Sequence, residues 1–475
     1  MKSKKVLLIL FFLLGNLSRA EVYAGNSDLA GISKDVSSRI DFNVSKAGPN
    51  DAGLLKGLLE KPITADAAVH IALLNNQSLQ AVLESWGIAK ADFNKTRLPE
   101  KPVLGTSVRF PKEGEPHNNT EFTVEQDFLS LILFPLKSNL AGAELHKVEL
   151  QITKEVLDLV FEVKSAFYEV QGDLAMLSTR KRVLEQAEAS QELAKRQFEA
   201  GNISELDDAN QKSIYEDAKL EHLKAEADLK LKKENLNRLM GFGGEDVPWE
   251  IKDELQEVQV SEPSLEELFS LGMSKRLDLL IARKNVEVLR HALSLNRFGI
   301  LGHPEVGVST EKDVEGGRVT GPTVKTKVLI YDLGQTEISR SGAQLKEAEL
   351  KLKAIENDVR SEIKQKRDRL FSIRTLVEEY KNSVIPIREK ITGETQKHYN
   401  YMLLGNYDLI RAKQNEILAN KEYIDSLKEY WIARSDLEKA VSSKLLLSTS
   451  VNKTMKKEEP IAGMSNRHHH GGSHE

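Results

Sequence analysis

Four histidines near the C-terminus are the side chains of this sequence best suited to bind a metal ion. His468, His469 and His470 are adjacent, and His474 follows shortly after them. Neutral imidazole nitrogens are good ligands for Zn, Cu, Ni or Co. The surrounding segment, 447–475, is polar and predicts a flexible tail, so metal binding there should be weak. The alternative is that this tail is inert.

The rest of the chain lacks the patterns of known enzyme active sites. It has no Gly-x-Ser-x-Gly, no His-Glu-x-x-His and no phosphate-binding loop, and its glycine-rich stretch 241–244 follows a predicted helix rather than a strand. Carboxylate pairs such as Asp207-Asp208 are common in a chain that is 29% charged. We therefore predict no catalysis and no cofactor.

Charge and cysteine content exclude further classes of partner and anchor. The net charge is −5, which predicts no nucleic-acid partner. The chain has no cysteine, so disulfides, thiolate metal sites and a lipid-modified N-terminal cysteine are excluded.

The N-terminus has the pattern of a secretory signal. Three lysines within the first five residues precede an apolar run, 6–14, and a small-x-small cleavage site ending at Ala20. A second site ends at Ala24, so the signal is predicted as 1–20 or 1–24. No later apolar run reaches the roughly 20 residues that span a bilayer as a helix. We therefore expect a mature chain that is soluble or that crosses a membrane as strands.

The chain repeats itself at an offset near 200 residues. Residues 65–73 align with 265–273, and Gly201-Asn202 aligns with Gly405-Asn406, 204 residues later. A shared offset at both ends of a unit indicates duplication of one large element. We predict an N-terminal segment, 25–62, followed by a first repeat over 63–245 and a second over 246–446.

Each repeat is predicted to contain two long helices. Proline-poor stretches with apolar residues every three or four positions predict helices over 138–200, 203–240, 335–404 and 406–445. The first would extend roughly 95 Å at 1.5 Å per residue. Two apolar stripes, Leu145 to Val163 and Ile373 to Ile391, follow a seven-residue repeat and predict coiled-coil packing. Pro386 should kink the third helix.

A short β-hairpin is predicted before the first long helix of each repeat. Apolar and polar residues alternate on both sides of a turn over 105–129 and again over 305–330. Four strands cannot close a barrel, and open edges cannot lie in lipid. The hairpins are therefore soluble caps on a helical bundle, or several chains combine them within a membrane. The fold class is mostly α with a small β part.

The order of these elements resembles the bacterial outer membrane efflux duct family, the TolC-like proteins. Residues 63–76, 198–207, 234–241 and 331–335 fit its sequence pattern. The stretch from Met402 to Gln414 is most similar to the branch that serves heavy-metal efflux pumps.

This resemblance implies a passive duct in the outer membrane, with most of the chain in the periplasm. Three chains would form one tube, with four strands from each in a 12-stranded β-barrel, followed by an α-helical barrel. A collar would include 27–62, 250–262 and the C-terminal region. The implied partners are outer membrane lipid, a periplasmic adaptor and an inner-membrane pump of the resistance-nodulation-division type. The alternatives are a duct for organic compounds or for type I secretion, and a periplasmic coiled-coil adaptor or structural protein.

The resemblance places the periplasmic aperture and the adaptor contacts at the two Gly-Asn turns. Arg411 stands six residues after Gly405, as Asp207 stands six residues after Gly201, which predicts an Asp207–Arg411 contact. The candidate residues are Gly201, Asn202, Asp207, Asp208, Tyr401, Gly405, Asn406, Tyr407, Asp408 and Arg411.

Overall fold

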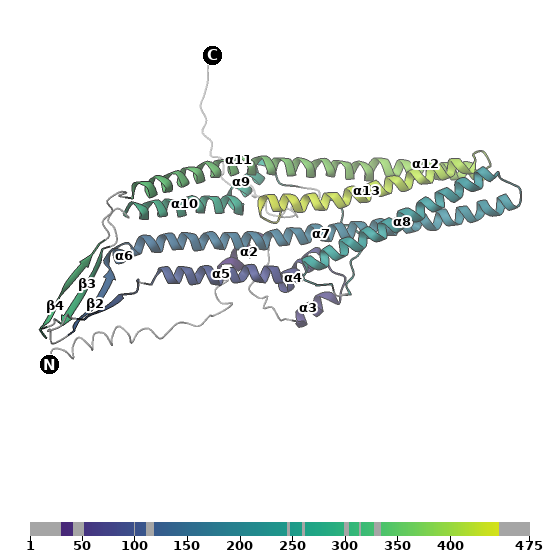
Figure 1. Cartoon of the computed structure of the whole chain (residues 1–475). Coiled ribbons are helices and arrows are strands. Elements are labelled where there is room, and N and C mark those ends of the chain that lie inside the picture. The colour runs from purple at the N-terminus through teal and green to yellow at the C-terminus, as the bar shows by residue number, and fades with distance from the viewer. Residues whose placement is uncertain are drawn as a thin grey trace, which may run out of the picture.

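The protein is an elongated helical body with a small sheet at one end (Figure 1). The computed structural model describes residues 30–40, 52–98, 100–110, 118–244, 248–258, 262–298, 304–312, 315–326 and 334–445. The predicted signal, the histidine tail and the stretch 331–333 of the family pattern lie outside these residues.

Two long helical hairpins form the body of the molecule. In the first, helix α7 (Phe134–Glu199) turns back into α8 (Glu205–Leu239). In the second, α11 (Gln335–Glu379), a π-helical turn (Tyr380–Val384) and α12 (Ile385–Asn400) lead into α13 (Asn406–Val441). The 66 residues of α7 extend about 100 Å. The predicted fold class, with long helical hairpins and a small β part, is confirmed.

A pair of shorter helices precedes each hairpin. Helices α4 (Ala65–Asn75) and α5 (Gln77–Thr96) recur 200 residues later as α9 (Leu265–Lys275) and α10 (Leu277–Arg297). A hydroxyl side chain caps the first helix of each pair and accepts a bond from a backbone N–H group: Thr64 from Ala67 and Ser264 from Glu267. The remaining short helices are α2 (Ala30–Ile40), α3 (Ala52–Leu59) and α6 (Phe128–Ile132).

Each hairpin has its own apolar core. One core surrounds α7, where Val156, Val163 and Val170 are fully buried against residues of α4 and α8. The other joins α11 to α13 through Ile363, Leu370 and Leu437. The Tyr168 ring of α7 stacks on the Trp431 ring of α13 with centroids 5.3 Å apart, which connects the two cores.

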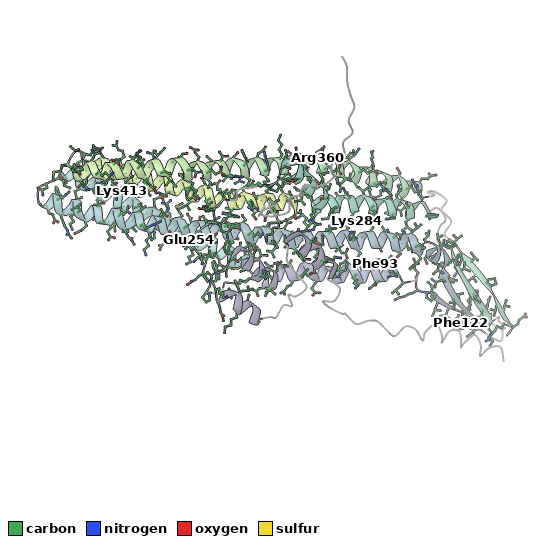
Figure 2. The ribbon with its side chains drawn as sticks, turned by 180° about the vertical axis from the view of Figure 1, so that it is seen from behind. Phe93, Phe122, Glu254, Lys284, Arg360 and Lys413 are labelled. Atoms are coloured by element: carbon green, nitrogen blue, oxygen red, sulfur yellow. The ribbon has the colours of Figure 1, made fainter. Side chains whose placement is uncertain are left out.

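The segment between the repeats, 248–258, crosses both hairpins at mid-length. The Gln171 side chain of α7 donates to the carbonyl oxygens of Lys252 and Glu254, at 3.0 Å each. The Trp431 indole N–H of α13 donates to the carbonyl oxygen of Gln256 at 2.8 Å. In Figure 2, Glu254 lies between Phe122 on the sheet and Lys413 towards the opposite end. The two hairpins are therefore held together well away from their tips.

The two β-hairpins join into one antiparallel sheet of order β1-β2-β3-β4. The strands are β1 (Val103–Arg109), β2 (Asn119–Asp127), β3 (Glu305–Lys312) and β4 (Arg318–Lys325). In the central pair, Val124 lies opposite Val308, and Glu125 lies opposite Gly307. Among the residues that the structure describes, strands β1 and β4 each have one neighbour, so this sheet has two open edges.

Pro386 does not end the third long helix. Proline has no N–H group, so a normal turn before it loses one bond. Here the backbone widens into the π-helical turn, in which the Ile385 N–H donates to the carbonyl oxygen of Tyr380, and α12 continues to Asn400. The apolar stripe predicted through this region is buried at Ile373 and Val377 only.

Beyond the π-helical turn, the same stripe is open. Ile387 and Ile391 are exposed, and the long helix that α12 chiefly contacts in the described chain is α13. Within this chain, the predicted apolar stripe is therefore covered at Ile373 and Val377 and open at Ile387 and Ile391.

Candidate functional site

The first hairpin ends in a tight turn that needs glycine. Gly201 has a φ of +76°, the left-handed conformation that glycine adopts without strain. The Asn202 N–H donates to the carbonyl oxygen of Gln197 at 2.8 Å, which closes the end of α7. Ser204 then caps α8, and its backbone N–H donates back to the Asp207 carboxylate at 3.2 Å.

The second hairpin repeats this turn with a different residue in the left-handed position. Met402 has a φ of +58°, and the Leu403 N–H donates to the carbonyl oxygen of His398 at 2.9 Å. Gly405 is the cap of α13 and provides no side chain. In this geometry Gly201 corresponds to Met402 and Ser204 to Gly405.

This correspondence corrects the alignment of the two Gly-Asn pairs. The counterpart of Gly201 lies 201 residues later, close to the offset of the shorter helices, and Gly405 is a helix cap rather than the turn residue. The residue equivalent to Asp207 is therefore Asp408 and not Arg411. The Gly-Asn dipeptide was a misleading guide because it occupies different positions of the two turns.

The two tips present different surfaces. At the second tip, Tyr401, Met402 and Leu403 are 77%, 93% and 67% exposed, so three large apolar side chains lie together in solvent. At the first tip, Gly201 and Asn202 are exposed. The second tip therefore presents three adjacent large apolar side chains, whereas at the first tip the exposed Phe198 and Leu206 are separated by the turn.

A hydrogen bond joins the tips of the two hairpins. The Tyr407 hydroxyl, in the first turn of α13, donates to Oδ1 of Asp207, in the first turn of α8. Asp207 Oδ2 accepts from the Ser204 hydroxyl at 2.8 Å, so the carboxylate is held from both sides. These bonds, first that from Tyr407 and then those from Ser204, lower the pKa of Asp207 below its usual value. The pKa of Tyr407 is raised by the same bond.

Arg411 does not take the predicted part in this contact. Among the residues that the structure describes, no ion pair involves Arg411, which is exposed. It lies one turn further along α13 than Tyr407, about 6 Å along the helix axis at 1.5 Å per residue. Tyr407 is therefore the residue of the second hairpin that meets Asp207.

Three further polar residues near the tips differ in how deeply they are buried and in whether their polar atoms have hydrogen-bond partners. Asp408 is exposed, and Asp208 is half-buried with Oδ1 enclosed and without a hydrogen-bond partner in the described chain. Gln211, one turn further along α8, is buried, and its Nε2 is likewise without a partner among these residues. Sequence reasoning did not single out Ser204, Met402 or Gln211. The Ser-x-x-Asp spacing of a capping box was the available signal for Ser204.

The hairpins are loosely packed between the connecting segment and the tips. A cavity of about 260 Å³ lies among α7, α8 and α13, with Met176, Ile214 and Ile417 in its wall. Arg180 of α7 pairs with Glu221 of α8 beside this cavity, and the hydrogen bond from Arg180 lowers the pKa of Glu221. The cavity interrupts the packing of α13 on the first hairpin between the connecting segment and the Tyr407–Asp207 contact.

At the opposite end, the sheet has one apolar and one polar face. Leu104, Phe122, Val124, Val308 and Val324 share a face by their register, and all are exposed. The other face carries charged pairs: Arg109 with Glu121 at 3.3 Å, and Lys325 with Glu125 at 2.5 Å. Gly307 makes room for Glu125, because a Cβ atom there would lie 2.2 Å from the carbonyl oxygen of Val124.

Within the described part of the chain, no helix is both long and apolar enough to cross a membrane. Nor do these residues contain a group of three or more His, Asp or Glu side chains placed to hold a metal ion. The predicted metal ligands His468, His469, His470 and His474 lie outside the described residues. The side chain of Asn406 is also outside the part that the structure describes.

Comparisons with known proteins agree with this architecture. Residues 68–242 match the model of the family described as outer membrane efflux protein. A comparison with curated proteins by sequence returned no match.

Solved structures of bacterial membrane proteins share the fold of most of the chain. A membrane protein from Pseudomonas aeruginosa is 18% identical over 86% of this chain and 95% of its own, with a TM-score of 0.66. The CmeC outer membrane channel of Campylobacter jejuni is 14% identical over 81% of this chain and 87% of its own, with a TM-score of 0.67. The MtrE outer membrane channel of Neisseria gonorrhoeae, in its open state, is 14% identical over 81% and 90%, with a TM-score of 0.64.

The matched family consists of efflux proteins and two of these structures are channels, in agreement with the prediction that the chain is not an enzyme. The resemblance to the heavy-metal branch stays a prediction. Residues 68–242 carry the sequence pattern of outer membrane efflux proteins, and more than four-fifths of the chain shares the fold of solved bacterial outer membrane channels.

Proposed function

We propose that this protein is the outer membrane channel of a three-part efflux system. Its partners would be a periplasmic adaptor and an inner-membrane pump of the resistance-nodulation-division type. The observation that carries this proposal is the separation of two ends: a sheet with an exposed apolar face, and helical tips joined by a hydrogen bond about 100 Å of helix away. The first end suits lipid and the second suits a periplasmic partner.

Unsatisfied edges and exposed apolar residues support a homotrimer. Strands β1 and β4 each lack a second neighbour, and only closure of the sheet removes such edges in lipid. Four strands from each of three chains would give the 12-stranded barrel that the resemblance implies. Ile387 and Ile391 of α12 and Leu220, Leu223 and Leu231 of α8 are exposed as well, and a neighbouring copy would cover them.

The helical tips are the proposed aperture and adaptor site. The contact of Tyr407 with Asp207 holds the second hairpin against the first and so favours a narrow aperture. The apolar surface of Tyr401, Met402 and Leu403 is the part best suited to pack against an adaptor helix. The other tip residues that we assign to this region are Gly201, Asn202, Asp208, Gly405, Asn406, Asp408 and Arg411.

Heavy-metal cations are the proposed substrates. Two sequence features support this proposal: the stretch from Met402 to Gln414 and the histidines 468–470 and 474. A polar segment of this composition would lose entropy when it binds an ion, so we expect it to concentrate metal weakly at the channel rather than to form part of the conduit. The alternatives are a duct for organic compounds or type I secretion, and a periplasmic adaptor or structural protein.

Gene deletion and complementation test this function. Loss of the gene should sensitise cells to Cu, Ag, Zn, Co or Cd, and the full-length gene should restore tolerance. A gene that lacks the codons for residues 464–475 should restore nearly all of the metal tolerance, because the histidines would only concentrate ions at the channel. If loss of the gene sensitises cells only to organic drugs or detergents, the proposal of a metal substrate is wrong and the proposal of an efflux channel still stands. Recovery of the protein in a periplasmic, membrane-free fraction would favour the adaptor alternative.

A further inference from the structure

A short helix at the junction between sheet and helical body presents an apolar surface to solvent. In α6, Phe128, Leu131 and Ile132 are 53%, 46% and 59% exposed, whereas Leu129 between them is buried. Figure 1 shows this helix at the end of the body where the sheet begins. An apolar helix face in this position needs a partner.

The position of α6 is fixed by polar contacts on its inner side. Asp127 caps the helix, with Oδ1 accepting from the Ser130 N–H at 3.0 Å. The Phe128 N–H donates to the carbonyl oxygen of Pro304, which directly precedes β3. The exposed side chains are therefore held in place by the fold rather than carried on a loose connection.

This surface continues the apolar face of the sheet. Strand β2 runs directly into α6, and Phe128 follows the alternation that places Phe122 and Val124 on that face. The nine residues of β2 would rise about 23 Å along a barrel axis if tilted by about 40°. The apolar band of a membrane barrel is about 25 Å tall. Helix α6 thus begins where such a band ends.

Basic side chains lie at the same end of the body. Lys95, Arg97 and Lys101, at and just beyond the end of α5, are exposed, as is Arg297 at the end of α10. Glu100, the acidic residue within 95–101, pairs with Lys137 at 2.7 Å. Exposed apolar side chains near basic side chains whose charge is not neutralised are suited to the surface of a phospholipid bilayer. At that surface the acyl chains begin directly below the charged phosphates.

We propose that α6 lies at the periplasmic boundary of the lipid and anchors the channel there. Phe128, Leu131 and Ile132 enter the edge of the acyl region, and the basic residues around them face lipid phosphates. This inference rests on the proposed function, because it requires the sheet to lie in a membrane. It assigns a lipid-binding role to residues outside the strands.

Fluorescence quenching by brominated lipid tests this placement. The full chain carrying Phe128→Trp is reconstituted in vesicles of phosphatidylcholine and phosphatidylglycerol brominated either near the headgroup or near the chain end. Fluorescence of the unsubstituted chain is subtracted, because Trp86, Trp249 and Trp431 lie in the helical body. The added tryptophan should lose most of its emission with the shallow bromine and less with the deep one.

Two matched variants separate the possible outcomes. Val124→Trp, on the apolar face of the sheet, should be quenched more by the deep bromine, and Phe371→Trp, exposed on α11, by neither. If Val124→Trp is quenched and Phe128→Trp is not, the anchor is rejected and the channel stands. If Val124→Trp is not quenched either, the membrane location of the sheet fails and the anchor fails with it. Ile132→Trp repeats the test on a second side chain of α6.

Discussion

Tyr407 of the second hairpin donates a hydrogen bond to Asp207 of the first, 200 residues earlier in the chain. Both residues lie in the first turn of a helix that leaves a tip, so the bond joins the starts of α8 and α13. The cavity among α7, α8 and α13 interrupts the packing of the two hairpins between the connecting segment and this bond. We therefore expect the bond to influence how far the two tips separate.

Tyr407→Phe should widen the aperture. The substitution removes the hydroxyl and keeps the ring, so the shape of the tip is retained and the bond to Asp207 is lost. Single-channel conductance in a planar bilayer should rise several-fold. Tyr401→Phe is the matched control, because Tyr401 is exposed at the same tip and has no such bond. Equal conductance of the two variants would show that the Tyr407–Asp207 bond does not restrict the channel.

Arg411→Glu should change conductance less than Tyr407→Phe. Arg411 is exposed and forms no ion pair in the described chain, so charge reversal breaks no contact between the hairpins of one molecule. The same bilayer recordings measure it. A larger effect from Arg411→Glu would indicate that Arg411 contacts the neighbouring copy. That contact, rather than the Tyr407–Asp207 bond, would then restrict the aperture.

The Tyr407–Asp207 contact should be insensitive to pH across the neutral range. The pKa of Asp207 is lowered, so the carboxylate accepts the bond at all pH values above this lowered pKa and loses it as pH falls through it. The pKa of Tyr407 is raised, so the phenol keeps its proton beyond its usual value of about 10. Conductance should be constant from about pH 5 to pH 9 and should rise in strong acid. A change in conductance near neutral pH would show that a different titratable group controls the aperture.

Met402→Gly should stabilise the second tip. A residue with a Cβ atom loses about 1–2 kcal/mol in the left-handed conformation, and glycine loses about 0.5–1 kcal/mol of chain entropy, so the net gain is about 1 kcal/mol or less. Gly201→Ala should destabilise the first tip for the same reason. Hydrogen exchange in the last turns of α12 and α7 measures both changes. Slower exchange in Gly201→Ala would contradict the assignment of the turn.

Gly241→Ala should destabilise the junction between α8 and α4. Gly241 has a φ of +83°, and an added Cβ atom would lie 2.5 Å from the carbonyl oxygen of Asn75. Strain and overpacking together should cost about 2 kcal/mol or more. Gly243→Ala is the control, since nothing lies within 4 Å of a Cβ atom there, and it should cost under about 0.5 kcal/mol. Similar urea denaturation midpoints for both variants would contradict this packing.

Local signals in the sequence predicted the long helices and the two β-hairpins, but not the short helices α2, α3 and α6. The proline-free stretch from 138 predicted α7, and alternation predicted strands around Val108 and Phe122, because helix and strand periodicity are properties of neighbouring residues. The effect of Pro386 was only partly predictable. Pro386 removes one backbone donor wherever it stands in a helix, but that the helix would continue through a π-helical turn could not be read from the residue type alone.

The candidate site was less predictable because it depends on the exact geometry of two turns. Gly201 and Gly405 have the same residue type but different roles, and Met402 occupies the left-handed position without the usual glycine. An error of three residues in the alignment was enough to give Asp207 the counterpart Arg411 instead of Asp408, and the residue that contacts Asp207, Tyr407, was not predicted to do so. A turn of α-helix has 3.6 residues, so such an error moves a side chain almost one full turn along the helix.

Native mass spectrometry of the full-length protein extracted from the outer membrane tests the central claim most directly. The open strands β1 and β4 and the exposed face of α12 require neighbouring copies if the sheet lies in lipid. The account predicts a detergent-dependent species with three times the mass of the mature chain, which separates into single chains on heating. A homogeneous single chain that stays in solution without detergent would contradict it.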